Sequence, residues 1–268
     1  MPSLLTTNQY KFDKTGRNTP FIVIGLQLNP DITIFDGGER LNLCPYAGEC
    51  ASVCLDKAGQ NAAPSAVAAR HRRTMLYYYD FPTFEKLLTK ELKHFWVDAG
   101  IDGWVRLNTL SDTRWEDKLG FDWFTQWEGM LGGFYDYTKW PMAKRHTLPP
   151  NYHLTYSWSE RTDEHEFWDN IESGRNVAVT MFVCRNKYAG DCRHGCHCPL
   201  PSHFKGVQVL DGDEHDARFD DPPERVVGLR LKRPIGGSMT LWEIIERAIQ
   251  ARDRGEPSFV QVPEIVII

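Results

Sequence analysis

Seven cysteines in two tight groups are the residues with the clearest chemical potential. The first group lies in CPYAGECASVC with the spacing C-x5-C-x3-C, and the second lies in CRNKYAGDCRHGCHC with the spacing C-x7-C-x3-C-x-C. Thiolates are soft ligands that suit iron–sulfur clusters and zinc. The grouping therefore predicts bound metal, with these ligands: Cys44, Cys50, Cys54, Cys184, Cys192, Cys196 and Cys198.

Several arrangements of metal are compatible with three plus four cysteines. A [4Fe–4S] cluster usually takes four cysteines, so the two groups together could hold one closed cluster. Alternatively, the first group holds a cluster with one open iron and the second group holds another cluster. Zinc in the second group, with His194 or His197 as a further ligand, is a third arrangement. Iron–sulfur is favoured over zinc because the first group lacks a fourth local ligand and C-x2-C pairs. Free buried cysteines are the non-metal alternative.

Polar residues that follow two strand-like segments are candidates for a substrate or cofactor pocket. Arg106, Asn108 and Asp112 belong to or follow WVRLNTL, and strand alternation would put Arg106 and Asn108 on one face. We assign candidate catalytic roles to Asp112 and Arg106, and candidate cofactor-binding roles to Asn108 and Lys139. Lys139 could neutralise an anionic cluster or bind a substrate carboxylate. The structural alternatives are a helix-capping Asp112 and a solvated Lys139.

Two runs of charge have simpler explanations than chemistry. The run Arg70–Arg73 could bind phosphate or nucleic acid, or balance the charge of a thiolate-bound cluster, but a solvated helical face is its commonest origin. The acidic stretch from Asp211 to Asp221 lacks the spacing of a calcium loop, so we expect it to be a solvated loop.

Strand-like and helix-like segments alternate along the chain. Apolar, β-branched runs predict strands, whereas apolar residues at helical spacing predict helices. The expected strands are 21–28, 104–110, 134–140, 152–158, 176–183, 206–210 and 225–231. The expected helices are 65–79, one opened by Pro82 and Thr83, 121–134, 164–172 and one from Thr240 to Gly255.

This alternation predicts an α/β fold with a mainly parallel sheet. Seven strands suggest a full or partial TIM-like barrel, with an open doubly wound sheet as the runner-up. In both, functional loops follow the carboxyl ends of strands. We therefore expect one domain over residues 1–268, with metal-binding loops at 44–54 and 184–198 that meet at one end of the sheet.

Composition narrows the class of protein. The chain has 268 residues, 41% hydrophobic and 25% charged, as in soluble globular proteins. Its formal charge of −5 gives no overall attraction to nucleic acid, which leaves nucleic acid weakly supported as a partner. No apolar run approaches the ~18 residues of a membrane span, and the N-terminus lacks a signal-peptide pattern. We expect a cytoplasmic protein, where clustered cysteines more often bind metal than form disulfides.

Three segments resemble the phage gene-product-88 family. They are CPYAGECASVC, WVRLNTLSDTRWED and FYDYTKW, and the resemblance covers about residues 40–200. The resemblance implies a viral origin and cysteine-bound metal without a settled activity. The chain departs from the family pattern at Leu110-Ser111 and in the spacing of the late cysteine group, which puts the ligand set in doubt.

The three-cysteine loop also has a distant similarity to radical S-adenosylmethionine enzymes. In those enzymes a three-cysteine loop follows the first strand of a partial barrel, and the open iron binds the cofactor. Their usual spacing, C-x3-C-x2-C, differs from the one here. The segment Asn108–Asp112 also replaces the glycine-rich motif that contacts the cofactor. S-adenosylmethionine is thus a weaker expectation than the cluster.

The sequence as a whole indicates a phage-type iron–sulfur protein with its cluster at the mouth of a barrel. Redox or radical-type catalysis on a small substrate is the leading function. The alternative is a non-enzymatic module whose iron–sulfur or zinc centre is structural and which acts through a host protein or nucleic acid. Three protein ligands on a cluster beside a pocket would favour catalysis, and four ligands on every cluster would favour a structural or electron-transfer role.

Overall fold

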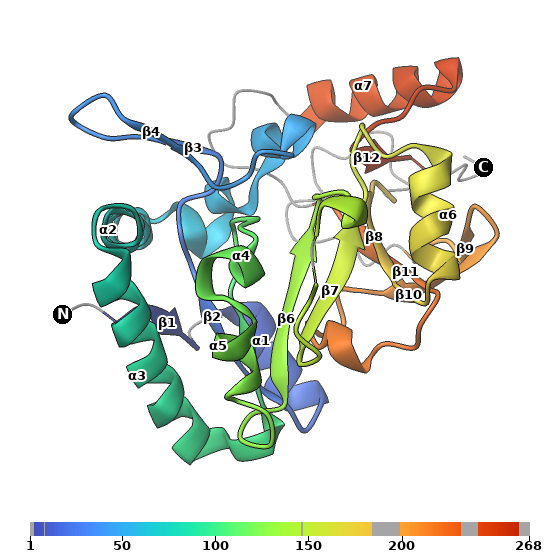
Figure 1. Cartoon of the computed structure of the whole chain (residues 1–268). Coiled ribbons are helices and arrows are strands. Elements are labelled where there is room, and N and C mark those ends of the chain that lie inside the picture. Colours follow the sequence, from blue (N-terminus) through green and yellow to red (C-terminus); the bar gives the residue numbers. More distant parts are fainter. Residues whose placement is uncertain (1–2, 8, 146, 184–198, 232–240, 263–268) are drawn as a thin grey trace.

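The computed structural model describes residues 3–7, 9–145, 147–183, 199–231 and 241–262. A ten-stranded sheet runs through the molecule (Figure 1). Its seven central strands are all parallel to one another, and they correspond to the seven expected strands. In spatial order they are β2 (Ile22–Leu26), β5 (Gly103–Arg106), β6 (Gly133–Thr138), β7 (Tyr152–Ser157), β8 (Val177–Met181), β11 (Val226–Arg230) and β10 (Val207–Asp211).

Short strands complete the sheet. β1 (Leu5–Thr6) pairs antiparallel with β2 at one edge, and β9 (His203–Phe204) pairs antiparallel with β10 at the other. β12 (Val260–Gln261) pairs parallel with the last two residues of β8. The mixed α/β fold and the parallel centre of the sheet confirm the expected α/β class with a mainly parallel sheet. Among the described residues the two edges do not pair with each other, so the sheet does not close into a full ring.

Helices between the central strands cover one face of the sheet. They are α2 (Pro64–Tyr79), α3 (Phe81–Ala99), α4 (Trp115–Leu119), α5 (Phe121–Thr125) and α6 (Glu164–Glu172). The main core lies under the first four, where Leu88 and Leu92 of α3 pack with Val105 and Phe134 of the sheet. Burying such side chains stabilises the fold by about 1.5–3 kcal/mol each.

The opposite face of the sheet is covered by α1 (Tyr10–Asn18) and by the segment 211–221, which contains the 3-10 helix η7 (Arg218–Asp220). Phe12 of α1 packs with Val23 and Tyr135 of the sheet. Phe219 of η7 stacks on Trp104, with ring centroids 3.4 Å apart. The side chains on this face, including that of Tyr135, therefore point away from α3.

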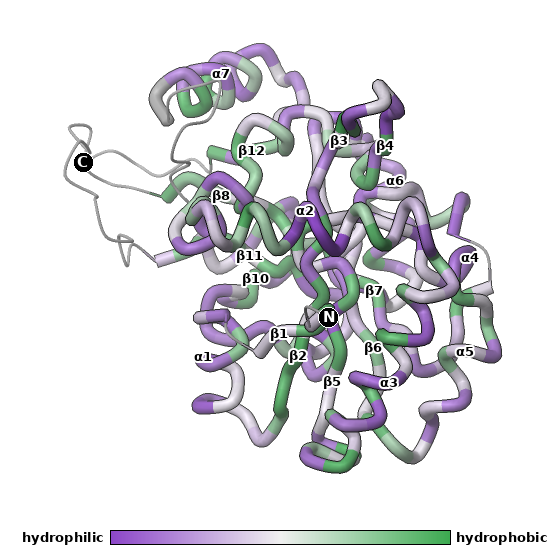
Figure 2. The backbone as a smooth tube through the Cα atoms, turned by 90° about the vertical axis from the view of Figure 1, so that its left-hand side faces the viewer, coloured by the Kyte–Doolittle hydropathy of each residue, from purple (hydrophilic) through white to green (hydrophobic). Residues whose placement is uncertain are grey.

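Most element boundaries agree with the sequence to within a few residues, but the helix expected over 121–134 ends at Thr125. Gly129 has a φ of +73°, a conformation that ends a helix and that glycine adopts without strain. The final helix, α7 (Leu241–Arg254), is confirmed, and its turns alternate between polar and apolar residues (Figure 2). In the described part of the chain, every helix is too short or too polar to cross a membrane.

Candidate metal centre

A series of short turns builds the first cysteine loop. The loop follows the hairpin of β3 (Ile32–Ile34) and β4 (Arg40–Asn42), and Asn42 Oδ1 accepts a 2.8 Å hydrogen bond from the Cys44 N–H. The 3-10 helices η1 (Gly48–Val53), η2 (Leu55–Lys57) and η3 (Gly59–Ala62) follow. Lys57 Nζ donates to the Ala51 carbonyl at 2.8 Å and ties η2 to η1. Turns of this kind keep the three cysteines of the loop in a small volume.

Gly48 is required at the start of η1. Its φ is +52°, and a Cβ there would overlap the Glu160 carboxylate. That carboxylate also accepts a 3.2 Å hydrogen bond from the Glu49 N–H. A larger residue at position 48 would therefore displace the contact between the cysteine loop and the end of β7.

The three thiols of the loop are half-buried and are not paired in a disulfide. Cys50 interacts electrostatically with both Cys44 and Cys54. Burial raises the pKa of Cys44 to about 12 and raises that of Cys54 as well. A thiol in such a place becomes a strong ligand only when a metal or a nearby cation stabilises the thiolate.

Lys139 supplies one such cation. It follows β6 directly, and its ammonium is close enough to Cys50 and Cys44 to interact with both. Burial alone would lower the pKa of Lys139, but Cys50, Asp112 and Cys44 raise it above its ordinary value. Lys139 is thus a charged residue beside the thiols, consistent with the role of neutralising an anionic centre rather than with a solvated surface lysine.

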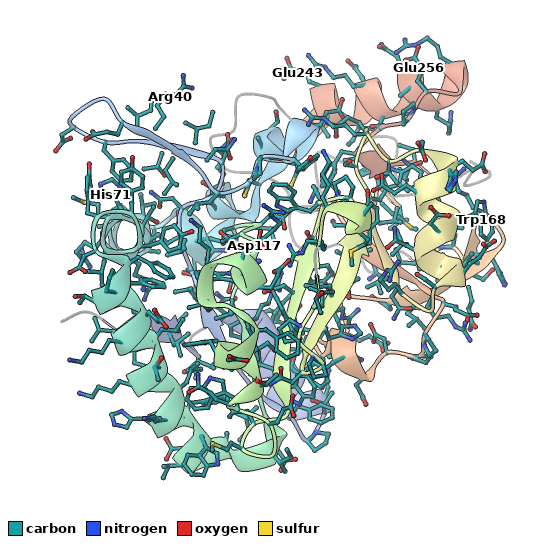
Figure 3. All side chains as sticks on the ribbon, in the orientation of Figure 1. Arg40, His71, Asp117, Trp168, Glu243 and Glu256 are labelled. Carbon is teal, nitrogen blue, oxygen red and sulfur yellow. The ribbon has the colours of Figure 1, made fainter. Side chains whose placement is uncertain are left out.

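Arg70 supplies a second cation, which interacts with Cys54. Its side chain is 2% exposed, and Nη1 donates a 2.7 Å hydrogen bond to the Asn61 carbonyl in η3. Burial lowers the pKa of Arg70, and Asp56 and Cys54 oppose that effect. Its neighbour His71 instead faces the β3–β4 hairpin, where Asn29 and Phe35 lie near its ring (Figure 3). Within the basic run Arg70–Arg73, Arg70 therefore contacts the cysteine loop, whereas His71 contacts other residues.

Asp112 joins the cysteine loop to the carboxyl ends of β5 and β6. Its N–H donates to the Leu43 carbonyl at 2.8 Å, and its Oδ2 accepts a 2.8 Å hydrogen bond from the Lys139 N–H. The Cys44 thiol lies 3.6 Å from the Leu110 carbonyl in the same segment. Burial raises the pKa of Asp112. The first cysteine loop, Asp112 and Lys139 thus share one edge of the sheet, as the sequence predicts.

Asn108 and Arg106 are each held by hydrogen bonds to other residues of the protein. β5 ends at Arg106, so strand alternation does not extend to Asn108. The Asn108 amide is buried and bonds to Thr113, Ser111 and Trp115, which shapes the turn before α4. Arg106 lies on the face of the sheet that carries Tyr135, where Nη1 donates to Asp216 Oδ2 at 2.7 Å. Both are held by structural contacts.

The acidic stretch contains residues that the sequence did not single out. The expectation of a solvated loop is wrong for its centre, because Asp216 is fully buried and also accepts a 3.0 Å hydrogen bond from the Tyr135 hydroxyl. Arg218, which is 1% exposed, pairs with Asp221 at 3.1 Å. Buried carboxylates are tolerated because arginines pair with them. The segment 211–221 therefore covers part of the sheet face that carries Tyr135.

The second cysteine group, Cys184, Cys192, Cys196 and Cys198, lies outside the described residues. In the sequence, Cys184 follows the end of β8 by three residues. Within the described ranges, no group of three or more His, Cys, Asp or Glu side chains is arranged to hold a metal ion. The ligand set therefore stays a prediction.

The residues of the first group nevertheless fit a cysteine-bound iron–sulfur centre. The sulfurs are soft donors, Lys139 interacts with Cys50 and Cys44, and Arg70 interacts with Cys54. Thiolate-bound clusters are anionic, so both cations would stabilise the loaded state. Cys44, Cys50 and Cys54 are the residues that would hold the metal.

Comparison with known proteins gives one match. The family model described as Gene product 88 matches residues 3–252. No curated protein and no solved structure matches the chain. The similarity to radical S-adenosylmethionine barrels thus has no support from these comparisons.

Proposed function

The chain belongs to the phage Gene product 88 family, and we propose that it is an iron–sulfur protein with its cluster at the carboxyl edge of the sheet. The observation that carries the proposal is the group of three half-buried thiols, two of which, Cys50 and Cys44, interact with the Lys139 ammonium. We further propose that the sheet is a partial barrel and that this edge is its mouth.

The residues around the thiols have separable tasks. Cys44, Cys50 and Cys54 would bind iron, and the second cysteine group would supply further ligands. Lys139 and Arg70 stabilise the thiolates by charge, while Asp112 fixes the backbone of Lys139 against the cysteine loop. When bound, an iron–sulfur cluster would supply electron transfer to or from a small molecule.

Metal analysis of the protein purified without oxygen tests this proposal. We expect iron and acid-labile sulfide in equal amounts, together with visible absorption that bleaches on reduction. Replacing any of Cys44, Cys50 or Cys54 by serine should lower the iron content. Ser52→Ala, a change in the same loop that removes no thiol, should leave it unchanged. Zinc without iron, or no metal in protein purified anaerobically, would overturn the proposal.

A further inference from the structure

A patch of polar side chains lies next to the cysteine loop on the face that carries Tyr135. Strand pairing brings Tyr137 of β6 opposite Thr155 of β7, and the next residues along the same face are Lys139 and Ser157. Lys139 Nζ donates to the Ser157 hydroxyl at 3.3 Å. The four side chains, Tyr137, Lys139, Thr155 and Ser157, form the polar patch.

Two hydroxyls of the polar patch have no partner among the described residues. The Thr155 side chain is fully buried, and its Oγ1 makes no hydrogen bond there. The buried Tyr137 hydroxyl likewise has none. Leaving a buried polar group unsatisfied costs about 1–3 kcal/mol, so each of these hydroxyls indicates that something outside this set completes it.

The charge around the polar patch selects an anion. In the described part of the chain Lys139 forms no ion pair within 4.0 Å with a carboxylate, and an ammonium group has N–H donors beyond the one that bonds to Ser157. The Arg106 guanidinium lies over the Tyr137 ring, 4.8 Å from its centroid. Arg106 is itself paired with Asp216, so Lys139 is the cation left for a ligand. The Phe259 ring, 5.3 Å from Lys139 Nζ, supplies an apolar wall.

We propose that the polar patch binds an oxyanion group, a carboxylate or a phosphate, of a small molecule. Lys139 Nζ, the Thr155 and Tyr137 hydroxyls and the Ser157 hydroxyl donate to its oxygens. Such hydrogen bonds to a charged group are about twice as strong as neutral ones. Because Lys139 also contacts Cys50, the oxyanion lies beside the thiols, and its role as part of the substrate rests on the proposed function.

Titration with inorganic phosphate, with acetate as a second probe, tests the polar patch directly. Phosphate binding is followed by ³¹P line broadening at constant ionic strength, in both the metal-free and the anaerobically purified protein. We expect saturable binding that Thr155→Val and Tyr137→Phe each weaken by about fivefold or more. The matched changes Thr125→Val and Tyr10→Phe, at positions away from the polar patch, should have no effect.

Stability separates a ligand site from a structural hydroxyl. Without phosphate, Thr155→Val should unfold at the same or a higher temperature, because it replaces an unpartnered hydroxyl by a methyl group. A clear loss of stability would show that the hydroxyl has a structural partner and would overturn the assignment. Non-saturable binding, or equal binding in wild type and variants, would also overturn it.

Iron content distinguishes this inference from the proposed function. Both variants should retain wild-type iron. A protein that contains iron but does not bind phosphate would overturn the oxyanion site and leave the iron–sulfur proposal in place. If the protein binds phosphate through Thr155 and Tyr137 but contains no iron, the oxyanion site is supported and the proposed iron–sulfur centre is overturned.

Discussion

The Lys139 N–H donates a 2.8 Å hydrogen bond to Oδ2 of Asp112, which connects two loops that the sequence places 27 residues apart. The same aspartate binds the Leu43 carbonyl through its own N–H, next to Cys44. The Trp140 indole also donates to the Asp112 carbonyl at 2.8 Å. One residue thus positions both the cation and the first thiol of the candidate centre.

Removing the Asp112 carboxylate should destabilise the contact between the cysteine loop and the segment that carries Lys139. Asp112→Ala leaves the buried Lys139 N–H without its acceptor, and we expect a loss of about 1–3 kcal/mol in the free energy of unfolding. Asp112→Asn retains an oxygen acceptor and should lose less. Urea unfolding of the metal-free protein measures both. Equal stability of Asp112→Ala and wild type would contradict the role described.

Neutralising Lys139 should weaken metal retention. Lys139→Met removes the positive charge beside Cys50, and we expect iron to pass to a chelator about fivefold faster or more, whereas Lys139→Arg should stay near wild type. Lys144→Met is the matched control, because the Lys144 ammonium contacts the Tyr46 hydroxyl and ring. Similar release rates for Lys139→Met and Lys144→Met would count against a charge effect at the thiols.

Arg70 should be the member of the basic run that matters for the cysteine loop. Arg70→Ala loses the hydrogen bond to Asn61, and charged hydrogen bonds contribute about 1.5–3 kcal/mol. The expected result is lower stability together with faster iron loss. Arg72→Ala, at an exposed neighbouring position, should change stability by at most about 0.5 kcal/mol. If the two variants behave alike in thermal unfolding and iron release, Arg70 has no special role.

The parallel strands were predictable because apolar, β-branched runs such as NVAVTMFV need burial on both faces. Their carboxyl ends then place the first cysteine loop, Asp112 and Lys139 at one edge. By contrast, the burial and hydrogen bonding of the Asn108 and Asp216 side chains depend on partners that local sequence patterns do not reveal. Asp216 pairs with Arg106, which lies 110 positions away in the sequence. The polarity of Asp216 alone therefore predicted that its side chain is exposed to solvent. The helix α1 was missed because YKFDKTGRN is polar and carries few apolar residues.

Breaking the Arg106–Asp216 pair should be costly. Asp216→Ala leaves Arg106 as an uncompensated buried charge, and such losses are typically about 3–5 kcal/mol. The double variant Arg106→Met with Asp216→Ala should lose less than the sum of the two single variants, because Arg106 is then no longer left unpaired. Urea unfolding of all four proteins gives the coupling. Additive effects would show that the two charges are independent.

Asp136 should make stability depend on pH. Burial raises its pKa to about 7, although the Tyr152 hydroxyl and the Asn108 N–H both donate to it. In the unfolded chain an aspartic acid titrates near ~3.9. The folded state therefore holds a proton that the unfolded state releases between about pH 4 and pH 7, and stability falls as pH rises through this range.

The contribution of Asp136 is on the order of 2–4 kcal/mol. Asp136→Asn, which keeps one oxygen acceptor, should flatten the pH dependence between about pH 4 and pH 7. Chemical unfolding of both proteins at a series of pH values measures the difference. Parallel curves for the two proteins would show that Asp136 titrates near its ordinary value.

Electron paramagnetic resonance of the reduced, anaerobically purified protein tests the central claim most directly. We expect an iron–sulfur signal in the wild type and in Ser52→Ala. That signal should be altered or lost when Cys44, Cys50 and Cys54 are all replaced by serine. An unchanged signal in the triple variant would show that these thiols do not bind the cluster. No iron–sulfur signal in a wild-type protein that also lacks iron would contradict the account as a whole.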